Sequence, residues 1–229
     1  MEYPHNRPYT ADDLVRIITL LRDPVNGCPW DKVQTHTSIR MNFLEEAYEA
    51  VDALDLDDPV LMCEELGDVL MQVAFHTCME QETGRFTWEQ VCDGVCQKLI
   101  ERHPNIFGTQ PGYEGITDWD ALKNKEKGRR TLADDLKSVP RAMPALMRAA
   151  KLQKRAARHG AALQGVDAAA LADAAENLQT AQPASAQAEQ AVGELLFAAA
   201  NLARQAGVDP EQALQKANEA FCIAAGPVA

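Results

Sequence analysis

The chain has 229 residues with 34 acidic and 22 basic side chains, so its formal net charge is −12. Such an acidic excess argues against a protein that binds nucleic acid broadly, because those proteins usually carry a basic excess. Alanine is abundant, β-branched and aromatic residues are few, and no convincing alternating strand pattern is present. We therefore expect an all-α fold.

The sequence also favours a particular compartment. It shows no signal peptide and no apolar run of about 18 residues, so we expect no membrane segment and no membrane partner. The six cysteines include no CxxC pair. We expect them to be reduced thiols in a cytoplasmic protein.

The negative charge is concentrated in one segment. Residues 41–84 contain twelve Asp or Glu and no Lys or Arg, so the rest of the chain is balanced with 22 of each sign. Fourteen of the bases fall between Lys98 and Arg158. An acidic segment suited to a metal ion and a basic segment together favour a small polyphosphate as the ligand.

The first predicted helix is capped by Thr10 and runs to about Leu21. Its expected buried face consists of Leu14, Ile17, Ile18 and Leu21. A loop follows, in which Trp30 either anchors the chain in the core or forms, with Lys32, a wall and a cation beside a ligand. The sequence leaves both interpretations open.

Two acidic helices come next, the first starting at Thr37 or Ser38 and the second capped by Asp58 with Pro59 at its first position. The short connection predicts antiparallel packing. Their expected apolar stripes are Leu44, Ala47, Tyr48 and Val51 on the first, and Leu66, Val69, Leu70 and Val73 on the second. Their carboxylates are Glu45, Glu46 and Glu49 on the first helix, and Glu65 and Asp68 on the second.

Packing these helices together would crowd four or five carboxylates, which raise one another's pKa. Either they form two solvated acidic faces, or a cation holds them. Ligands that are all oxygen select Mg²⁺, Mn²⁺ or Ca²⁺ over Zn²⁺. A glycine inside a helix costs about 1 kcal/mol of stability relative to Ala. We therefore expect that backbone or a ligand comes close to the second acidic helix at Gly67, where a side chain would be in the way.

The predicted elements after residue 83 are a turn, a helix capped by Thr87 and a loop from 104 to 118. Lys98, Arg102 and His103 lie near the end of this helix, where they either complement its dipole or bind phosphate. A short helix from Trp119 to Lys127 carries Lys123. The basic, proline-broken stretch that follows is interpreted as a linker.

The second half of the sequence resembles a degenerate repeat of the first. Residues 192–197 align with 66–71 at an offset of 126, which matches Glu194 to Asp68 and Ala191 to Glu65. Asp173 is a shifted remnant of the earlier helix's carboxylates. The expected elements are a helix from about Met147, a turn at 181–185, a helix from 186 to 206 and a last helix capped by Asp209. We expect helical pairing here but poor metal binding.

The pattern Glu45-Glu46-x-x-Glu49 followed by Glu65-x-x-Asp68 resembles that of the MazG-type nucleoside triphosphate pyrophosphohydrolases. Four further motifs share this resemblance: Gly27-Cys28-Pro29-Trp30-Asp31, Gln34-Thr35-His36, Gly84-Arg85-Phe86 and Arg102-His103-Pro104-x-x-Phe107-Gly108. The resemblance is dense from about residue 12 to 130. It implies an all-α fold, a homodimer, and Mg²⁺-dependent conversion of NTP to NMP and pyrophosphate.

By this resemblance Glu46, Glu49, Glu65 and Asp68 are the expected metal ligands, and Glu45 is a further ligand or orients the attacking water. Mn²⁺ is a possible substitute for Mg²⁺. The candidates for substrate binding are Trp30, Lys32, Lys98, Arg102, Trp119 and Lys123. The expected domains are 1–130 for catalysis, 131–146 as linker and 147–229 as a degenerate copy.

Two other functions stay open at this stage. The worn second copy would suit a catalytically silent helical regulator that binds nucleotide or protein. The carboxylates alone would suit a bundle that binds divalent ions for structural reasons, although the basic segments argue against this.

Overall fold

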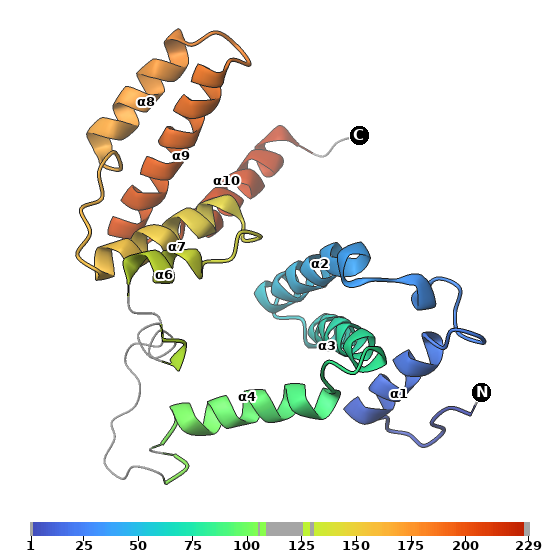
Figure 1. Ribbon diagram of the computed structural model, residues 1–229. Helices are drawn as coiled ribbons and strands as arrows, with labels where there is room; N and C mark the ends of the chain where they lie inside the picture. The colour runs from blue at the N-terminus through green and yellow to red at the C-terminus, as the bar shows by residue number, and fades with distance from the viewer. Residues whose placement is uncertain (1, 105, 109–125, 129–130, 227–229) are drawn as a thin grey trace. The chain divides into compact units, whose positions relative to one another are not determined.

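The computed structural model describes residues 2–104, 106–108, 126–128 and 131–226. The chain divides into two compact units, Met1–Ile116 and Thr117–Ala229, and each is described by itself. All regular secondary structure within the described residues is helical (Figure 1), so the all-α prediction is confirmed.

Unit 1 is built on a hairpin of two long helices. Its elements are α1 (Ala11–Leu21), the 3-10 turn η1 (Asp31–Val33), α2 (His36–Asp55), α3 (Pro59–Glu82) and α4 (Trp88–Arg102). Helices α2 and α3 lie side by side, and α1 and α4 each pack on α3 (Figure 1). The predicted pairing of the two acidic helices is therefore confirmed.

Local capping fixes where these helices begin. Thr10 and Thr87 cap α1 and α4, and Asp58 accepts from the backbone N–H groups of Val60 and Leu61 with Pro59 in the first turn of α3. The predicted start of α2 at Thr37 or Ser38 is wrong. Thr35 is the cap, because its side chain and that of Ser38 bond reciprocally to each other's backbone N–H.

The core of unit 1 lies between α1, the start of α2, the C-terminal half of α3 and the start of α4. Its buried members are Val15, Ile18, Ile39, Ala74, Phe75, Cys78, Met79 and Trp88. The expected burial of Leu21 is wrong, because its side chain is 40 % exposed and Val15 takes the place in the core.

The apolar stripes of the acidic helices are only partly covered within the unit. Tyr48 and Val51 on α2, and Leu66 and Leu70 on α3, are between 40 and 53 % exposed. The buried residues in the second half of α2 are instead the small Ala50 and Ala53. The hairpin thus leaves an apolar surface open.

Unit 2 is built on a second hairpin. Its elements are α6 (Leu132–Lys137), α7 (Ala145–Arg158), α8 (Ala168–Thr180), α9 (Ala186–Gln205) and α10 (Pro210–Ala225). Helices α8 and α9 form the hairpin, and α7 packs on α9, with α6 beside α7 (Figure 1). The predicted turn at 181–185 and the cap at Asp209 are confirmed.

Helix α6 lies inside the stretch that was interpreted as linker. Asp135 on this helix is fully buried and forms ion pairs with Arg155, Arg158 and His159, the first at 2.9 Å. A buried carboxylate needs such partners. Residues 132–137 are therefore part of the packed structure of unit 2.

No helix within the described residues is both long and apolar enough to cross a membrane.

Candidate metal and nucleotide site

Three carboxylates meet across the α2–α3 hairpin. Glu46 and Glu49 lie three residues apart on α2, and Glu65 faces them from α3. One oxygen from each lies within 4.8 Å of the others. The turn at Leu56 and Asp57, where Asp57 has φ 52°, reverses the chain, and Asp58 then caps the start of α3.

The carboxylates of this cluster carry like charges that repel one another. Loss of solvation raises the pKa of Glu46 above its ordinary 4.5, and the neighbouring charges of Asp68, Glu49 and Glu45 raise it further, although a hydrogen bond from Gln72 opposes the shift. The pKa of Glu65 is likewise raised, first by loss of solvation and then by Glu49 and Asp68. Asp68 thus acts on both helices.

The five predicted carboxylates are not equivalent. Glu46, Glu49 and Glu65 form the convergent set, and Asp68 stands close enough to perturb Glu46 and Glu65. Glu45 is exposed and acts electrostatically on its neighbour Glu46.

Gln72 is a further member of the site. Its Nε2 donates to Glu46 Oε1 at 3.4 Å, and its Oε1 is buried without a hydrogen-bond partner among the described residues. The spacing held a signal for it, because Gln72 follows Glu65 by seven residues and Asp68 by four, which places all three on one face of α3.

This donor set fits a hard divalent cation. It consists of carboxylate oxygens, which are the ligands that Mg²⁺ and Mn²⁺ prefer. Loss of solvation and then the neighbouring carboxylates raise the pKa values of Glu46 and Glu65, and a cation between them would offset this charge. Glu46, Glu49, Glu65 and Asp68 are the residues that would hold it.

Packing among the described residues does not explain Gly67. A Cβ built on it would meet no atom of these residues within 4 Å apart from the backbone of its own helix, so no other described segment approaches it. The position faces open space on the same exposed part of α3 as Leu66.

The predicted substrate residues lie on several elements. Trp30 is 56 % exposed, so the interpretation of it as a core anchor is wrong, and Lys32 follows in η1. Lys98 and Arg102 belong to the last two turns of α4. Trp119 and Lys123 lie outside the described residues, and all six assignments stay predictions.

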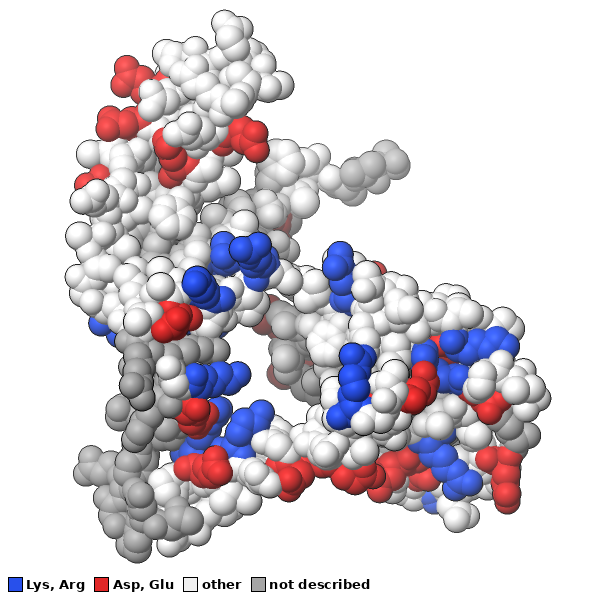
Figure 2. Space-filling view, viewed as in Figure 1, with Lys and Arg blue, Asp and Glu red and all other residues white. Residues whose placement is uncertain are grey.

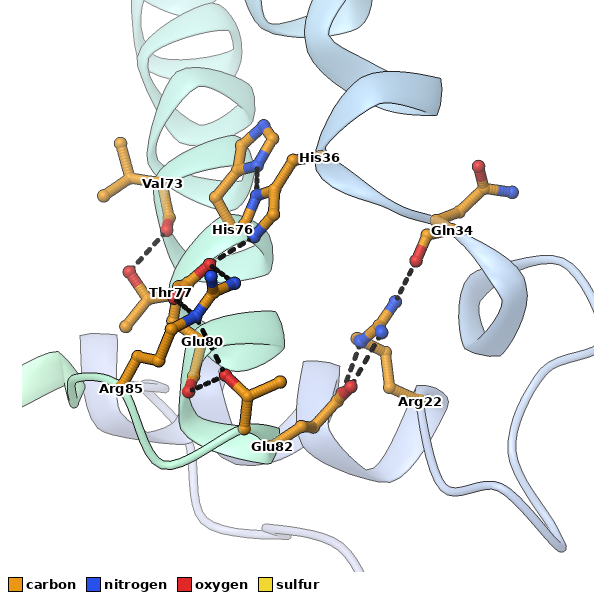
Figure 3. Close-up of polar contacts among 10 residues, drawn as sticks. Arg22, Gln34, His36, Val73, His76, Thr77, Glu80, Glu82 and Arg85 are labelled. Carbon is orange, nitrogen blue, oxygen red and sulfur yellow. Dashed lines mark hydrogen bonds and ion pairs between the residues drawn. The ribbon is translucent and has the colours of Figure 1, made fainter.

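Arg22 holds the loop that carries Trp30 (Figure 3). The residue is 8 % exposed, and its guanidinium pairs with Glu82 at 2.5 and 2.9 Å and donates to the carbonyl oxygens of Asp31 and Gln34. Gly27 lets this loop close, because a Cβ there would lie 2.4 Å from two carbonyl oxygens. Arg22 was missed in the sequence, where it stands as an ordinary base at a helix end.

A second polar network ties the start of α2 to the end of α3 (Figure 3). The His36 and His76 rings stack with their Nδ1 atoms 2.7 Å apart, and His36 Nε2 lies 2.5 Å from the buried Glu80. Arg85 donates to the same carboxylate. His36 and Arg85 were noticed only as parts of motifs, and their meeting at Glu80 depends on the tertiary fold.

The corresponding hairpin of unit 2 has no such cluster. Asp173 and Glu194 are both exposed, and Glu194 accepts a hydrogen bond from Gln190 of its own helix. Within the described part of the chain, the only group of three or more potential metal ligands is that of Glu46, Glu49 and Glu65.

Comparison with known proteins agrees with this site. Residues 34–107, which span α2, α3 and α4, match the MazG nucleotide pyrophosphohydrolase domain. The nucleoside triphosphate pyrophosphohydrolase of Escherichia coli K12 is 42 % identical over 219 residues, which cover 92 % of this chain and 83 % of that protein. The nucleoside triphosphate pyrophosphohydrolase/pyrophosphatase MazG of Thermotoga maritima is 38 % identical over 92 % of this chain and 82 % of that protein.

The similarity extends across both units, because these alignments cover more than nine-tenths of the chain. An uncharacterised protein of Bacillus subtilis, YabN, is 38 % identical over 90 % of this chain, which corresponds to 43 % of the longer protein. The chain thus belongs to the MazG family of nucleotide pyrophosphohydrolases.

Proposed function

We propose that this protein hydrolyses nucleoside triphosphates to nucleoside monophosphates and pyrophosphate, in the cleaning of the nucleotide pool. The observation that carries the proposal is the meeting of Glu46, Glu49 and Glu65 across the hairpin that matches the family domain. The named activity of the relatives in Escherichia coli and Thermotoga maritima supports it.

The residues of the cluster have distinct proposed tasks. Glu46, Glu49, Glu65 and Asp68 hold Mg²⁺, with Mn²⁺ as a substitute, and Gln72 orients Glu46 through its hydrogen bond. The exposed Glu45 is a further ligand or orients the attacking water. A bound divalent ion would neutralise phosphate charge and lower the pKa of water.

Substrate binding is assigned to residues outside the cluster. Lys32, Lys98, Arg102 and Lys123 are proposed to contact phosphates, and Trp30 or Trp119 to stack on the base. The exposure of Trp30 supports its part, because a buried indole would have no face to offer. The position of Trp30 is fixed through Arg22, which bonds to the backbone of the same loop.

We assign catalysis to residues 1–130 and a supporting role to residues 147–229. The different arrangement of carboxylates on the two hairpins supports this assignment. The α2–α3 hairpin brings three carboxylates together, whereas Glu194 and Asp173 stay exposed on theirs. With one or two carboxylates, Mg²⁺ keeps most of its water and binds weakly.

We also propose that the active protein is a homodimer formed through the open faces of α2 and α3. The exposed Tyr48, Val51, Leu66 and Leu70 support this, because contiguous apolar patches usually mark interfaces. A cytoplasmic location stays a prediction, and the six cysteines are all free thiols, as is usual in a reducing compartment.

The test is a panel of nucleoside triphosphates with purified protein and Mg²⁺, with products identified by chromatography. Release of monophosphate and pyrophosphate is expected, and orthophosphate as the first product would contradict the proposal. No turnover with any triphosphate would favour the alternative, a silent regulator that binds nucleotide or protein.

The site assignment is tested by Glu49→Ala and Asp68→Ala, each expected to lower turnover by at least about a hundredfold, as removal of one electrostatic stabiliser does. The matched control is Asp55→Ala, an exposed acid at the end of α2. Circular dichroism should show an unchanged helical fold in all three. Near-normal pyrophosphate release from both site variants would refute the assignment.

A further inference from the structure

Unit 2 contains a pocket between α7 and the connection from α9 to α10. Its volume is about 590 Å³, which is in the range of small-molecule sites. Helix α7 contributes Lys151 and Lys154, the end of α9 contributes Arg204, and residues 207–210 close the other side.

The three basic side chains of this pocket have no acidic partner among the described residues. Lys151 and Lys154 lie one turn apart on α7, and neither they nor Arg204 form an ion pair among the described residues. Basic residues elsewhere on the same helix differ, because Arg155 and Arg158 both form ion pairs with the buried Asp135. On the face shown in Figure 2, basic side chains gather where Figure 1 draws α7.

Arg204 is held in place before any ligand arrives. Its Nε and Nη2 both donate to Asn201 Oδ1, at 3.1 and 2.8 Å. Asn201 is 1 % exposed and is itself fixed by donating to the carbonyl oxygen of Val166 at 2.9 Å. A guanidinium oriented in this way keeps further N–H groups for a ligand and loses little entropy on binding.

One acid, Asp209, lines the pocket, and Glu211 follows it in α10; both carboxylates accept hydrogen bonds from backbone N–H groups. Asp209 Oδ1 accepts from the backbone N–H groups of Glu211 and Gln212, at 2.9 and 3.1 Å. Glu211 Oε2 accepts from the backbone N–H of Met147. The remaining wall is apolar and includes Met147 and Val208.

We propose that this pocket binds a phosphate-bearing anion of up to nucleotide size. Arginine and lysine are the side chains that bind phosphate groups, and the apolar wall gives room for an organic part. The site lies wholly within unit 2, so it is separate from the carboxylate cluster of unit 1 and does not depend on the function proposed for that cluster.

The proposal is tested by titration calorimetry on the full chain, with inorganic pyrophosphate and with AMP, in EDTA so that no divalent ion recruits phosphate to unit 1. The test variant is Lys151→Gln with Lys154→Gln. The control is Lys137→Gln with Lys216→Gln, which removes the same charge from exposed positions of unit 2 outside the pocket.

We expect at least one of the two anions to bind the wild type, the test variant to bind at least about tenfold more weakly, and the control to bind normally. Binding of both anions would show that the phosphate groups suffice, and binding of AMP alone would show that the apolar wall contributes. Absence of binding at millimolar concentration, or equal weakening in test and control variants, would overturn the proposal.

Discussion

The carboxylates of the cluster weaken the metal-free protein at neutral pH. A carboxyl whose pKa rises on folding stabilises the native state fully below its unfolded pKa and loses this contribution as the pH rises through the folded value. Both Glu46 and Glu65 have pKa values raised above 4.5. Their ionised forms therefore oppose folding at pH 7 until a cation offsets the charge.

Replacing Glu65 by Gln should accordingly raise the melting temperature of the metal-free protein at pH 7. The same change should reduce the further rise that Mg²⁺ gives the wild type, since a ligand is lost. Scanning calorimetry with EDTA and then with Mg²⁺ measures both effects, with Asp55→Asn as control. A lower melting temperature in EDTA would show that the repulsion is not the dominant effect at this residue.

His76 affects the pH dependence of stability in the opposite direction, because it destabilises the native state at acid pH. Loss of solvation, and next the facing His36, lower the pKa of His76 below its ordinary 6.5. A base with a lowered folded pKa is protonated more readily when unfolded, so stability is complete above about pH 6.5 and falls as the pH drops toward the folded pKa.

We expect the wild type to lose at most about 4 °C of melting temperature from this residue between pH 7.5 and pH 5.5. The variant His76→Gln should lose less over the same interval, when both proteins are melted in matched buffers. The interval stays above the 4.5 of ordinary glutamates, which limits their interference. Equal losses in both proteins would remove His76 from this explanation.

At the scale of elements, Arg22 joins α1, η1 and α3 through one side chain. The variant Arg22→Leu would leave Glu82 and the carbonyl oxygens of Asp31 and Gln34 without this donor. We expect a loss of about 2–4 kcal/mol in unfolding free energy and faster proteolysis of residues 23–34. Urea unfolding and limited proteolysis measure these, with the exposed Arg16→Leu of α1 as control. A loss no larger than that of the control would rule out this role.

Helix ends were predictable because capping is local. Asp58 with Pro59 specifies the start of α3 within a few residues of sequence. Thr35 was missed as the start of α2 because several hydroxyl side chains follow in succession, and only the reciprocal bond with Ser38 selects one. Helix α6 was missed because six residues carry little periodicity, and Asp135 is explained only by partners twenty or more residues away.

In the site, too, local spacing was predictable from the sequence and contacts between distant segments were not. Spacing alone predicted that four or five carboxylates of the two acidic helices come together, because it fixes which side of each helix they occupy. Three of them, Glu46, Glu49 and Glu65, form the group that meets in the structure. Periodicity could not say which apolar stripes are covered, since that depends on partner surfaces, and Tyr48 and Leu66 proved exposed. The roles of Arg22 and Glu80 could not be predicted from the sequence, because their contacts join segments that are distant along the chain.

The two hairpins predict an asymmetry of function. Glu194 occupies the position that aligns with Asp68, yet it lies exposed and bonds only to Gln190 among the described residues. Glu194→Ala should therefore leave turnover within about a factor of two of the wild type. Steady-state pyrophosphate release measures this, with Asp68→Ala as the contrasting variant. An inactive Glu194→Ala protein of normal stability would point to a working second site.

At the scale of the whole molecule, the open apolar faces of unit 1 require an explanation. Leu66 and Leu70 on α3, and Tyr48 and Val51 on α2, expose 40 to 53 % of their surface. Gly67 beside them leaves space at the helix surface that none of the described residues fills. Covering the exposed half of such a side chain is worth about 1 kcal/mol, which favours a second copy on this face.

We therefore expect light scattering coupled to size exclusion to give about twice the single-chain mass of 25.1 kDa. The variant Leu66→Gln with Leu70→Gln should shift the protein toward the single-chain mass, because polar groups in the centre of an interface lose their solvation without a partner. Ile223→Gln is the control, since Ile223 is 82 % exposed on α10 of the other unit. A wild type that stays at the single-chain mass at micromolar concentration contradicts the dimer. If the double variant is still a dimer, the interface lies elsewhere, because two glutamines buried at the centre of an interface would weaken it.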